Sequence, residues 1–269
     1  MIDLLKTTIN LGLEKPVKIL HITDIHLTYS NSEDSEFHQE FMKRRYQTFY
    51  NEGGNPPYNP KQYFEMAIKY AKDNDCLLVI TGDAYDILTK GNVEVYKQIT
   101  NGVDYMFTPG GHEHQKQCVR TMEEPFPYIE ETRPKVQEIF NKHNLDLTSK
   151  VINGVNIVCA DNSLDYYSPK TLQLFKKELE KGLPIIVFSH DPIWDRMLKH
   201  TAPYHPNVRL TEKDYKASHE MIDLILNNPL VITTFAGHNH KHMEMEMEGK
   251  IHYSTAGLFK GQARLIEIV

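Results

Sequence analysis

The chain has 269 residues, of which 40 % are hydrophobic and 25 % are charged, and its formal net charge is −6. This composition is ordinary for a globular domain with one large core. The acidic balance excludes a general attraction to nucleic acid or to an anionic membrane surface. We therefore expect no nucleic-acid partner and no membrane association.

Cysteine usage and the N-terminal residues indicate the compartment. Of the three scattered cysteines, Cys76 and Cys159 lie inside apolar runs, which favours buried free thiols over a disulfide framework. The first residues lack the basic start and apolar core of a signal peptide. No apolar run approaches the ~20 residues that a bilayer crossing needs. These observations predict a cytoplasmic location.

The first half of the chain alternates β-branched apolar runs with segments of helical spacing. The elements expected here are strands at 17–22, 76–80 and 104–107 and helices near 38–49, 60–73 and 91–101. Polar and aromatic residues at about 29–59 indicate an insertion. Within it, the basic run Lys43-Arg44-Arg45 is expected on a solvated helix face.

The second half continues the alternation after a stretch, 115–133, that fits no element. The elements expected here are helices near 134–143, 169–181 and 211–227, strands at 184–188 and 231–235, and hairpins at 150–160 and 242–253. A closing strand is expected at 263–269, either at the edge of a sheet or within it. Gly154 suits the turn of the first hairpin. Ser168-Pro169 and Gly182 are typical of a helix start and a helix end.

The order of these elements predicts the fold class. Strands that alternate with helices favour parallel pairing and sheet faces covered by helices, and the hairpins add antiparallel pairs. We expect an α/β fold, a four-layer sandwich of two mixed β-sheets flanked by helices. No repeat, low-complexity tract or linker divides the chain, so we expect one domain over 1–269. The insertion at about 29–59 and a loop at about 191–210 are expected to wall its substrate cleft.

Five of the expected strands are followed at once by side chains that can bind a metal. These side chains are Asp24 and His26, Asp83, then His112, Glu113 and His114, then His190 and Asp191, and finally His238, Asn239 and His240. Any one of them alone is explained by a turn, a helix cap or a hydrogen-bonded core histidine. Five in succession favour one site, because groups at the carboxyl ends of parallel strands converge. Carboxylates and imidazoles suit borderline divalent ions such as Zn, Mn, Fe or Ni.

The motifs DIH, GD, GGHE, SH and GHNH occur in this order from residue 17 to about 260. They resemble the calcineurin-like metallophosphoesterase family, whose pattern is D-x-H, G-D, G-N-H-D/E, a lone His and G-H-x-H. The resemblance implies two mixed sheets flanked by helices. It also implies a hydrolase of phosphodiesters or phosphomonoesters that uses a hydroxide bridging two divalent cations. The expected substrate is a small phosphate ester or a nucleotide.

The resemblance also assigns roles to individual residues. It places the first ion on Asp24, His26, Asp83 and His240. It places the second ion on Asp83, His190 and His238, so that Asp83 bridges the two ions. His112 aligns with the family histidine that is not a ligand and that stabilises charge or protonates the leaving oxygen. Other substrate-binding residues are not identified.

The sequence departs from the family pattern at Gly111, where the family has an asparagine that binds the second ion. Three alternatives follow. A water fills the position and leaves a weaker second site, or His114 or Glu113 acts as a substitute ligand, or the second site is poorly occupied. In the structural alternatives Glu113 caps its neighbours and His114 is a surface-loop histidine. We expect a lower affinity for the second ion than for the first.

Two other functions compete with hydrolysis of a small phosphate ester. Loss of a ligand at Gly111 is compatible with a catalytically weakened member that acts as an interaction scaffold. A nuclease uses the same chemistry, but the acidic balance makes long polyanions poor substrates. Aromatic and basic loop residues offer either substrate contacts or local packing; they are Tyr58, Trp194, Arg196, Tyr204 and Arg209.

Overall fold

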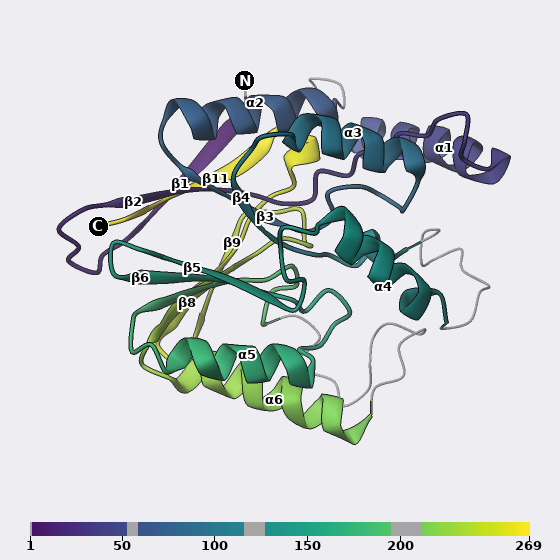
Figure 1. The fold of residues 1–269 in the computed structure, drawn as a ribbon. Coiled ribbons are helices and arrows are strands. Elements are labelled where there is room, and N and C mark those ends of the chain that lie inside the picture. The colour runs from purple at the N-terminus through teal and green to yellow at the C-terminus, as the bar shows by residue number, and fades with distance from the viewer. Residues whose placement is uncertain (1, 53–58, 116–126, 195–210) are drawn as a thin grey trace.

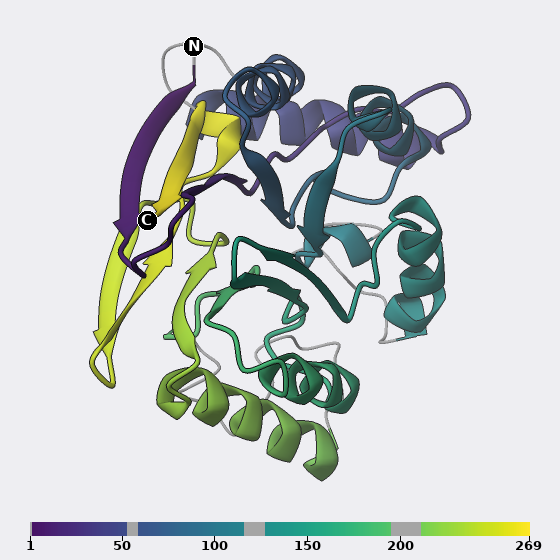
Figure 2. The same ribbon diagram turned by 60° about the vertical axis from the view of Figure 1, so that its left-hand side comes forward.

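A computed structural model describes residues 2–52, 59–115, 127–194 and 211–269. Two mixed β-sheets lie face to face, and helices cover the outer face of each sheet (Figure 1). The layers therefore follow the order helix, sheet, sheet, helix, which is also visible from a second direction (Figure 2). The predicted fold class is confirmed.

The first sheet has five strands in the order β1-β11-β2-β3-β4. Their bounds are β1 Asp3–Ile9, β2 Val17–Ile22, β3 Leu77–Thr81, β4 Tyr105–Thr108 and β11 Gln262–Ile268. Only β11 and β2 pair antiparallel; the other neighbours are parallel. Strands β2, β3 and β4 thus end at the same edge of this sheet.

The second sheet has six strands in the order β5-β6-β7-β8-β10-β9. Their bounds are β5 Leu147–Ile152, β6 Val155–Ala160, β7 Ile185–Phe188, β8 Val231–Ala236, β9 Met243–Met247 and β10 Lys250–Ser254. Hairpins β5/β6 and β9/β10 are antiparallel, while β6, β7, β8 and β10 run parallel. The ends of β7 and β8 therefore lie side by side.

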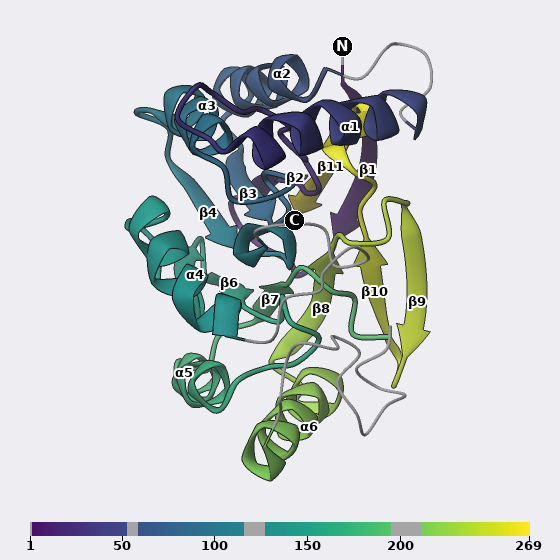
Figure 3. The ribbon, with the colours of Figure 1, turned by 90° about the vertical axis from the view of Figure 1, so that its right-hand side faces the viewer.

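The helices surround these sheets. Their bounds are α1 Glu36–Glu52, α2 Pro60–Asp73, α3 Lys90–Thr100, α4 Pro127–Ile139, α5 Pro169–Leu179 and α6 Glu212–Asn227. Local sequence starts several of them: the Ser168 side chain caps α5 before Pro169, and Thr211 and Asp214 form a capping box on α6. Figure 3 shows α1 in front of the other helices of its layer and of the five-stranded sheet.

Apolar side chains fill three spaces between the four layers. One cluster joins the five-stranded sheet to α2, α3 and α4, and another joins the six-stranded sheet to α5 and α6. The third lies between the sheets. Strand β2 contributes to two of them, because Ile19 belongs to the inter-sheet cluster and Leu20 and Ile22 to the helix side. This alternation fixes the register of β2 and hence the position of the residues that follow it.

The expected elements agree with the observed ones apart from four differences. Strand β1, which lies at a sheet edge and has a mostly exposed pattern, was not predicted. Helix α4 begins at Pro127 rather than near residue 134. Helix α1 is longer than expected. Strand β11 lies inside its sheet, between β1 and β2, so the alternative of an edge strand is wrong. None of the helices in the described part of the chain has the length and apolar character that a membrane crossing requires.

A buried histidine on β2 links this core to pH. His21 lies between the sheets, hydrogen-bonds the hydroxyls of Thr81 and Thr255 at 2.8 Å each, and is fully buried. Burial and the nearby Arg264 guanidinium lower the pKa of His21 to about 3. The unfolded chain, in which a histidine has an ordinary pKa near 6.5, therefore binds the proton first as pH falls.

This residue should make the fold less stable below neutral pH. Each pH unit below ~6.5 should lower the free energy of unfolding by about 1.4 kcal/mol through His21. Urea denaturation at pH 7.5 and 5.5 with chelator present measures the effect. His21→Gln should lose most of this pH dependence, whereas His219→Gln, at an exposed position of α6, should retain it. Equal pH dependence in His21→Gln and the parent protein would contradict the assignment.

Candidate metal centre

The metal-capable side chains come together where strands of both sheets end. Asp24 and His26 follow β2, and Asp83 follows β3. His190 follows β7 in the other sheet, and His238 and His240 follow β8. Four clusters of His and acidic side chains, each with ligand atoms within 4.8 Å of one another, connect these loops across the junction of the sheets. The convergence expected from the sequence is therefore present for these residues.

The backbone at this junction is unusual. Asp24, His26, Asp83, His238 and His240 all have φ between +50° and +66°, the left-handed region that residues with a side chain rarely adopt. Such conformations persist only where the surroundings enforce them, and they concentrate at functional sites. These left-handed backbone angles set the directions of the side chains that follow the strand ends. The alternation of side chains along a strand does not predict those directions.

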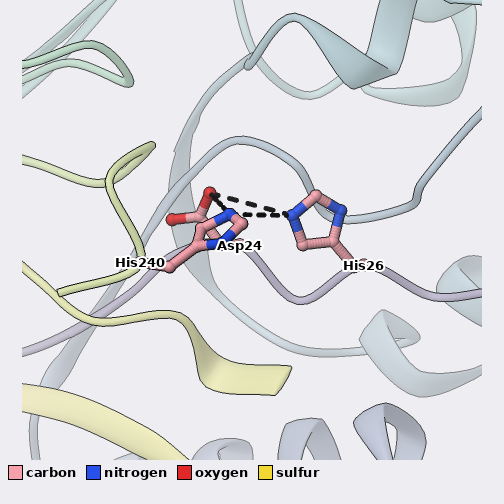
Figure 4. Close-up of side chains that lie close together, drawn as sticks. All are labelled: Asp24, His26 and His240. Atoms are coloured by element: carbon pink, nitrogen blue, oxygen red, sulfur yellow. Dashed lines mark hydrogen bonds and ion pairs between the residues drawn. The ribbon is translucent and has the colours of Figure 1, made fainter. Parts of the chain in front are cut away.

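The first cluster contains Asp24, His26 and His240 (Figure 4). The His240 Nε2 atom lies 3.2 Å from Asp24 Oδ1 and 3.3 Å from His26 Nε2, and His26 Nε2 lies 3.9 Å from the same oxygen. Asp24 is held from its other oxygen, which accepts hydrogen bonds from the Thr23 hydroxyl and the His238 backbone N–H. Two imidazoles thus face the remaining carboxylate oxygen.

Asp83 lies between this cluster and the histidine of the second sheet. Its Oδ2 atom is 3.3 Å from His190 Nε2, 3.8 Å from His26 Nε2 and 3.9 Å from His112 Nε2. Asp24, Asp83 and His190 also form a cluster of their own. Asp83 is the residue whose carboxylate approaches side chains on both sides, as a bridging ligand must.

The second cluster contains His190, Asp191 and His238. The Nδ1 atom of His190 lies 2.7 Å from the Thr81 carbonyl oxygen, which leaves Nε2 directed at Asp83. His238 Nδ1 lies 3.2 Å from Asp191 Oδ1. The side chain of His238 is 41 % exposed, so this side of the site is open to solvent.

His112 lies beside these clusters, in the 3₁₀ helix η1 (His112–His114). Its Nδ1 atom is 2.6 Å from the Asp86 carbonyl oxygen and 3.3 Å from Asp86 Oδ1, and its backbone N–H donates to Asp83 Oδ1. The opposite ring nitrogen therefore faces Asp83 and the partly exposed site.

Asp86 and Arg45 belong to this site although no sequence motif marked them. The Arg45 guanidinium donates two hydrogen bonds, of 2.6 and 2.8 Å, to the buried Asp86 carboxylate. Lys43 and Arg44 are exposed, so the expectation of a solvated face holds for these two residues but is wrong for Arg45. The only available signal was the position of Asp86 three residues after Asp83; no local pattern indicated the pairing with Arg45.

Helix α1 also brings an aromatic side chain to the site. The Phe49 ring stacks on His26 with 4.4 Å between the ring centroids, and Phe259 meets Phe49 edge-on at 5.0 Å. Arg45 lies over the Phe49 ring at 4.7 Å. The segment that the sequence marked as an insertion therefore forms one wall of the metal-capable clusters.

The charges of the site depend on one another. Burial alone would raise the pKa of Asp83, but the imidazoles of His190 and His112 hold it well below its usual range. The same opposition acts on Asp86, whose pKa is lowered by Arg45 and His112 against the effect of burial. In turn, burial opposes protonation of His112, yet the Asp83 and Asp86 carboxylates raise its pKa to about 10. His112 thus holds a proton at neutral pH.

Glu113 has a structural role in this arrangement. Its carboxylate accepts hydrogen bonds from the backbone N–H groups of Asp83, Ala84 and Gly110 at 3.0, 2.6 and 2.6 Å. Burial and the Asp83 charge raise the pKa of Glu113 to about 7, although the backbone donors oppose this. Because both oxygens already accept backbone donors, the structure favours the capping alternative over a role as substitute ligand.

His114 and Gly111 define the other side of the same turn. His114 is fully buried, so the alternative of a surface-loop histidine is wrong. Among the described residues, the metal-capable clusters include neither His114 nor Glu113. Gly111 has ordinary right-handed helical backbone angles, φ −64° and ψ −35°, and a Cβ atom there would lie 3.3 Å from the Ser163 carbonyl oxygen.

The donor set fits divalent metal ions. Carboxylate oxygens and imidazole nitrogens are ligands of Zn, Mn, Fe and Ni. Asp24 Oδ1 and His190 Nε2 are buried, and each faces another member of the clusters, His240 Nε2 at 3.2 Å and Asp83 Oδ2 at 3.3 Å. Buried carboxylates that lie this close together are costly unless cations bind there. The arrangement is therefore suited to two ions that share Asp83.

Several residues proposed from the sequence to contact substrate lie outside the described residues. These are Tyr58, Arg196, Tyr204 and Arg209, with most of the loop at about 191–210. Trp194 is described and packs against the apolar cluster under α5 and α6. Local packing thus accounts for Trp194.

Comparison with solved structures supports the fold. The chain is similar to a dimetal phosphatase from Danio rerio, with a TM-score of 0.51, 12 % identity and coverage of 91 % of this chain and 88 % of that one. GAP50, the anchor in the inner membrane complex of Plasmodium, gives a TM-score of 0.46, 12 % identity and 91 % and 72 % coverage. The phosphopantetheinyl hydrolase of Mycobacterium tuberculosis gives 0.42, 11 % and 90 % of each chain. At 12 % identity the similarity to the dimetal phosphatase bears on the fold alone, and nothing is concluded from the two with lower TM-scores.

Comparison of sequences identifies the family. No curated protein sequence matches the chain. A sequence profile described as calcineurin-like phosphoesterase, however, matches residues 17–242, which is well over half of the chain and includes the ends of β2, β3, β4, β7 and β8. The chain belongs to the calcineurin-like phosphoesterase family.

Proposed function

We propose that this protein hydrolyses phosphoric esters of small molecules or nucleotides with the help of two divalent cations. The position of Asp83 carries the proposal, because its carboxylate approaches His26 on one side and His190 on the other. Family membership supports a phosphate ester as the substrate class. The open side of the site at His238 gives a substrate access to this position.

The first ion would be held by the cluster of Figure 4 together with Asp83. The second would be held by Asp83, His190 and His238. When bound, two such ions polarise a phosphoryl oxygen and lower the pKa of water into the neutral range. They also reverse the negative potential that the Asp24 and Asp83 carboxylates create, which an anionic substrate requires.

His112 supplies the proton in this proposal. Its Nε2 atom faces Asp83 and the site, whereas Nδ1 is fixed by the Asp86 carbonyl oxygen. In the site without ions, the Asp83 and Asp86 carboxylates raise the pKa of His112 to about 10 against the effect of burial. Once Asp83 binds the ions, the Asp86 carboxylate, 3.3 Å from Nδ1, remains to favour the protonated imidazole. A protonated imidazole in this position stabilises developing charge and donates to the leaving oxygen.

The scaffold alternative finds less support. Five strained left-handed residues and the buried carboxylates of Asp24 and Asp83 carry a free-energy cost. A surface that only binds another protein does not require these strained and buried groups.

Hydrolysis of aryl phosphomonoester and phosphodiester substrates tests the proposal. The assay uses metal-stripped protein to which Mn, Zn, Ni or Fe is added. Absence of turnover with every ion would sink it.

Removal of the proton donor should separate catalysis from metal binding. His112→Asn should lower kcat by about 10²–10⁴-fold, the usual contribution of a general acid. The metal content, measured by inductively coupled plasma mass spectrometry, should remain that of the parent protein. His219→Asn on α6 serves as the matched control and should change neither quantity. Loss of metal together with rate would instead make His112 a ligand.

Removal of the bridging carboxylate should affect both ions. Asp83→Ala should abolish turnover and release both metals, because its carboxylate is shared between the two clusters. Asp223→Ala, at an exposed position of α6, is the control and should retain both. If one ion keeps its affinity in Asp83→Ala, the shared position is assigned to the wrong residue.

Arg45 should matter through its contact with Asp86. Arg45→Gln should lower kcat by roughly 10–100-fold with little change in KM, the range seen when a partner of a functional group is lost. The neighbouring Arg44→Gln is the matched control, because Arg44 is exposed on the same helix. A rise in KM with unchanged kcat would show that Arg45 contacts substrate instead of positioning His112 through Asp86.

A further inference from the structure

The second cluster has no side chain from position 111, but a carboxylate lies beside its two histidines. His190, Asp191 and His238 each offer a ligand atom within 4.8 Å of the others. We propose that Asp191 is a ligand of the second divalent ion and takes the coordination position that Gly111 leaves without a side chain. This inference rests on the proposed function, since it concerns the same two-ion centre.

The environment of Asp191 suits such a role. Its side chain is only 5 % exposed, and Oδ1 lies 3.2 Å from His238 Nδ1. A buried carboxylate is costly unless a cation or several donors stabilise its charge. With Asp83, His190 and His238, Asp191 makes four ligands, the number that zinc prefers.

Asn162 holds the backbone of Asp191 and of its neighbour His190 in place. Its Oδ1 atom accepts the backbone N–H groups of both His190 and Asp191 at 3.0 Å, and its Nδ2 donates to the Asp191 carbonyl oxygen at 2.8 Å. The His190 carbonyl oxygen in turn accepts the N–H of Gly237, next to His238. The three residues of the second cluster therefore form one hydrogen-bonded unit rather than three independent loops.

The turn that contains Gly110 and Gly111 lies beside the second cluster and places no side chain at residue 111. A Cβ atom on Gly110 would lie 2.3 Å from Asp83 Oδ1 and 2.9 Å from His190 Cε1, so this turn packs directly against the second cluster. A Cβ atom on Gly111 would lie 3.3 Å from the carbonyl oxygen of Ser163, the residue after Asn162. Residue 111 therefore adjoins, through Ser163 and Asn162, the loop that carries His190 and Asp191.

A metal titration in solution tests the role of Asp191. Metal-free protein titrated with Mn²⁺ in a calorimeter should bind two ions, and the spin-coupled signal in electron paramagnetic resonance should mark the pair. Asp191→Ala should weaken the second ion at least tenfold and leave the first unchanged, and the coupled signal should fade. Asp191→Asn, which retains an oxygen, should lie between, and the control Asp223→Ala should match the parent. An unchanged second ion in Asp191→Ala overturns the inference.

A double variant asks whether residues 111 and 191 serve the same position. Gly111→Asn should change second-ion affinity little in the parent protein but restore it in Asp191→Ala, whereas Gly111→Ala should restore nothing. Such non-additivity is expected of two groups that compete for one place. An equal gain from Gly111→Asn in both backgrounds would mean two independent positions and would overturn the inference.

A crystal loaded with Zn²⁺ separates a ligand from a residue that merely orients His238. An anomalous peak about 2.0–2.2 Å from an Asp191 carboxylate oxygen supports the inference. A peak bound by His238, with Asp191 bonded only to the imidazole, overturns it. These readouts are independent of turnover. If two ions bind in this way but no ester is hydrolysed, the proposed function fails while the assignment of Asp191 stands.

Discussion

The structure depends on the stabilisation of buried carboxylates at the junction of two sheets. Burial opposes the charge of three carboxylates at this junction, those of Asp24, Asp83 and Asp86. Nearby imidazoles lower the pKa of all three, and for Asp86 the Arg45 guanidinium lowers it as well. The compensating histidines come from the other sheet or from distant loops. The histidines that lower the pKa of Asp24 and Asp83 include His240 and His190 of the six-stranded sheet. The two sheets must therefore meet in one register for these two charges to be tolerated, which ties the site to the inter-sheet core around Ile19 and Phe188.

The close approach of the loops requires glycine at particular positions. A Cβ atom on Gly237 would lie 1.8 Å from Thr23 Oγ1 and 2.6 Å from Asp24 Oδ2, and one on Gly82 would lie 2.2 Å from the Gly110 backbone nitrogen. Next to these glycines, Asp24, Asp83 and His238 adopt left-handed backbone angles. The glycines allow the loops to touch, and the strained residues then direct donor atoms inward. The motif residues and their neighbouring glycines together therefore determine where the donor atoms lie.

The sequence was sufficient for what is local and periodic. Apolar runs located β2, β3, β7 and β8, and the donors that follow them could be expected to converge. What could not be predicted depends on distance along the chain. Arg45 and Asp86 are 41 residues apart, and Asn162 holds Asp191 from 29 residues away, so neither pairing leaves a local pattern. Strand β1 was not predicted because its residues are mostly exposed and form no apolar run. Its strand conformation depends on backbone pairing with β11, which is distant in the sequence.

The identity of the ligand beside Gly111 affects reactivity as well as affinity. If Asp191 is a ligand as proposed, its carboxylate would bind a divalent ion more strongly than a neutral amide does, and the second site would not be weakened by the glycine at position 111. The carboxylate also cancels more charge: three carboxylates against two divalent ions leave one net positive charge, whereas two carboxylates and an amide leave two. A lower positive charge weakens the attraction of a phosphomonoester dianion more than that of a singly charged phosphodiester, because the Coulomb energy scales with the product of the charges. An Asp191 ligand in place of the family asparagine would therefore favour diesters more than the asparagine-containing centre does.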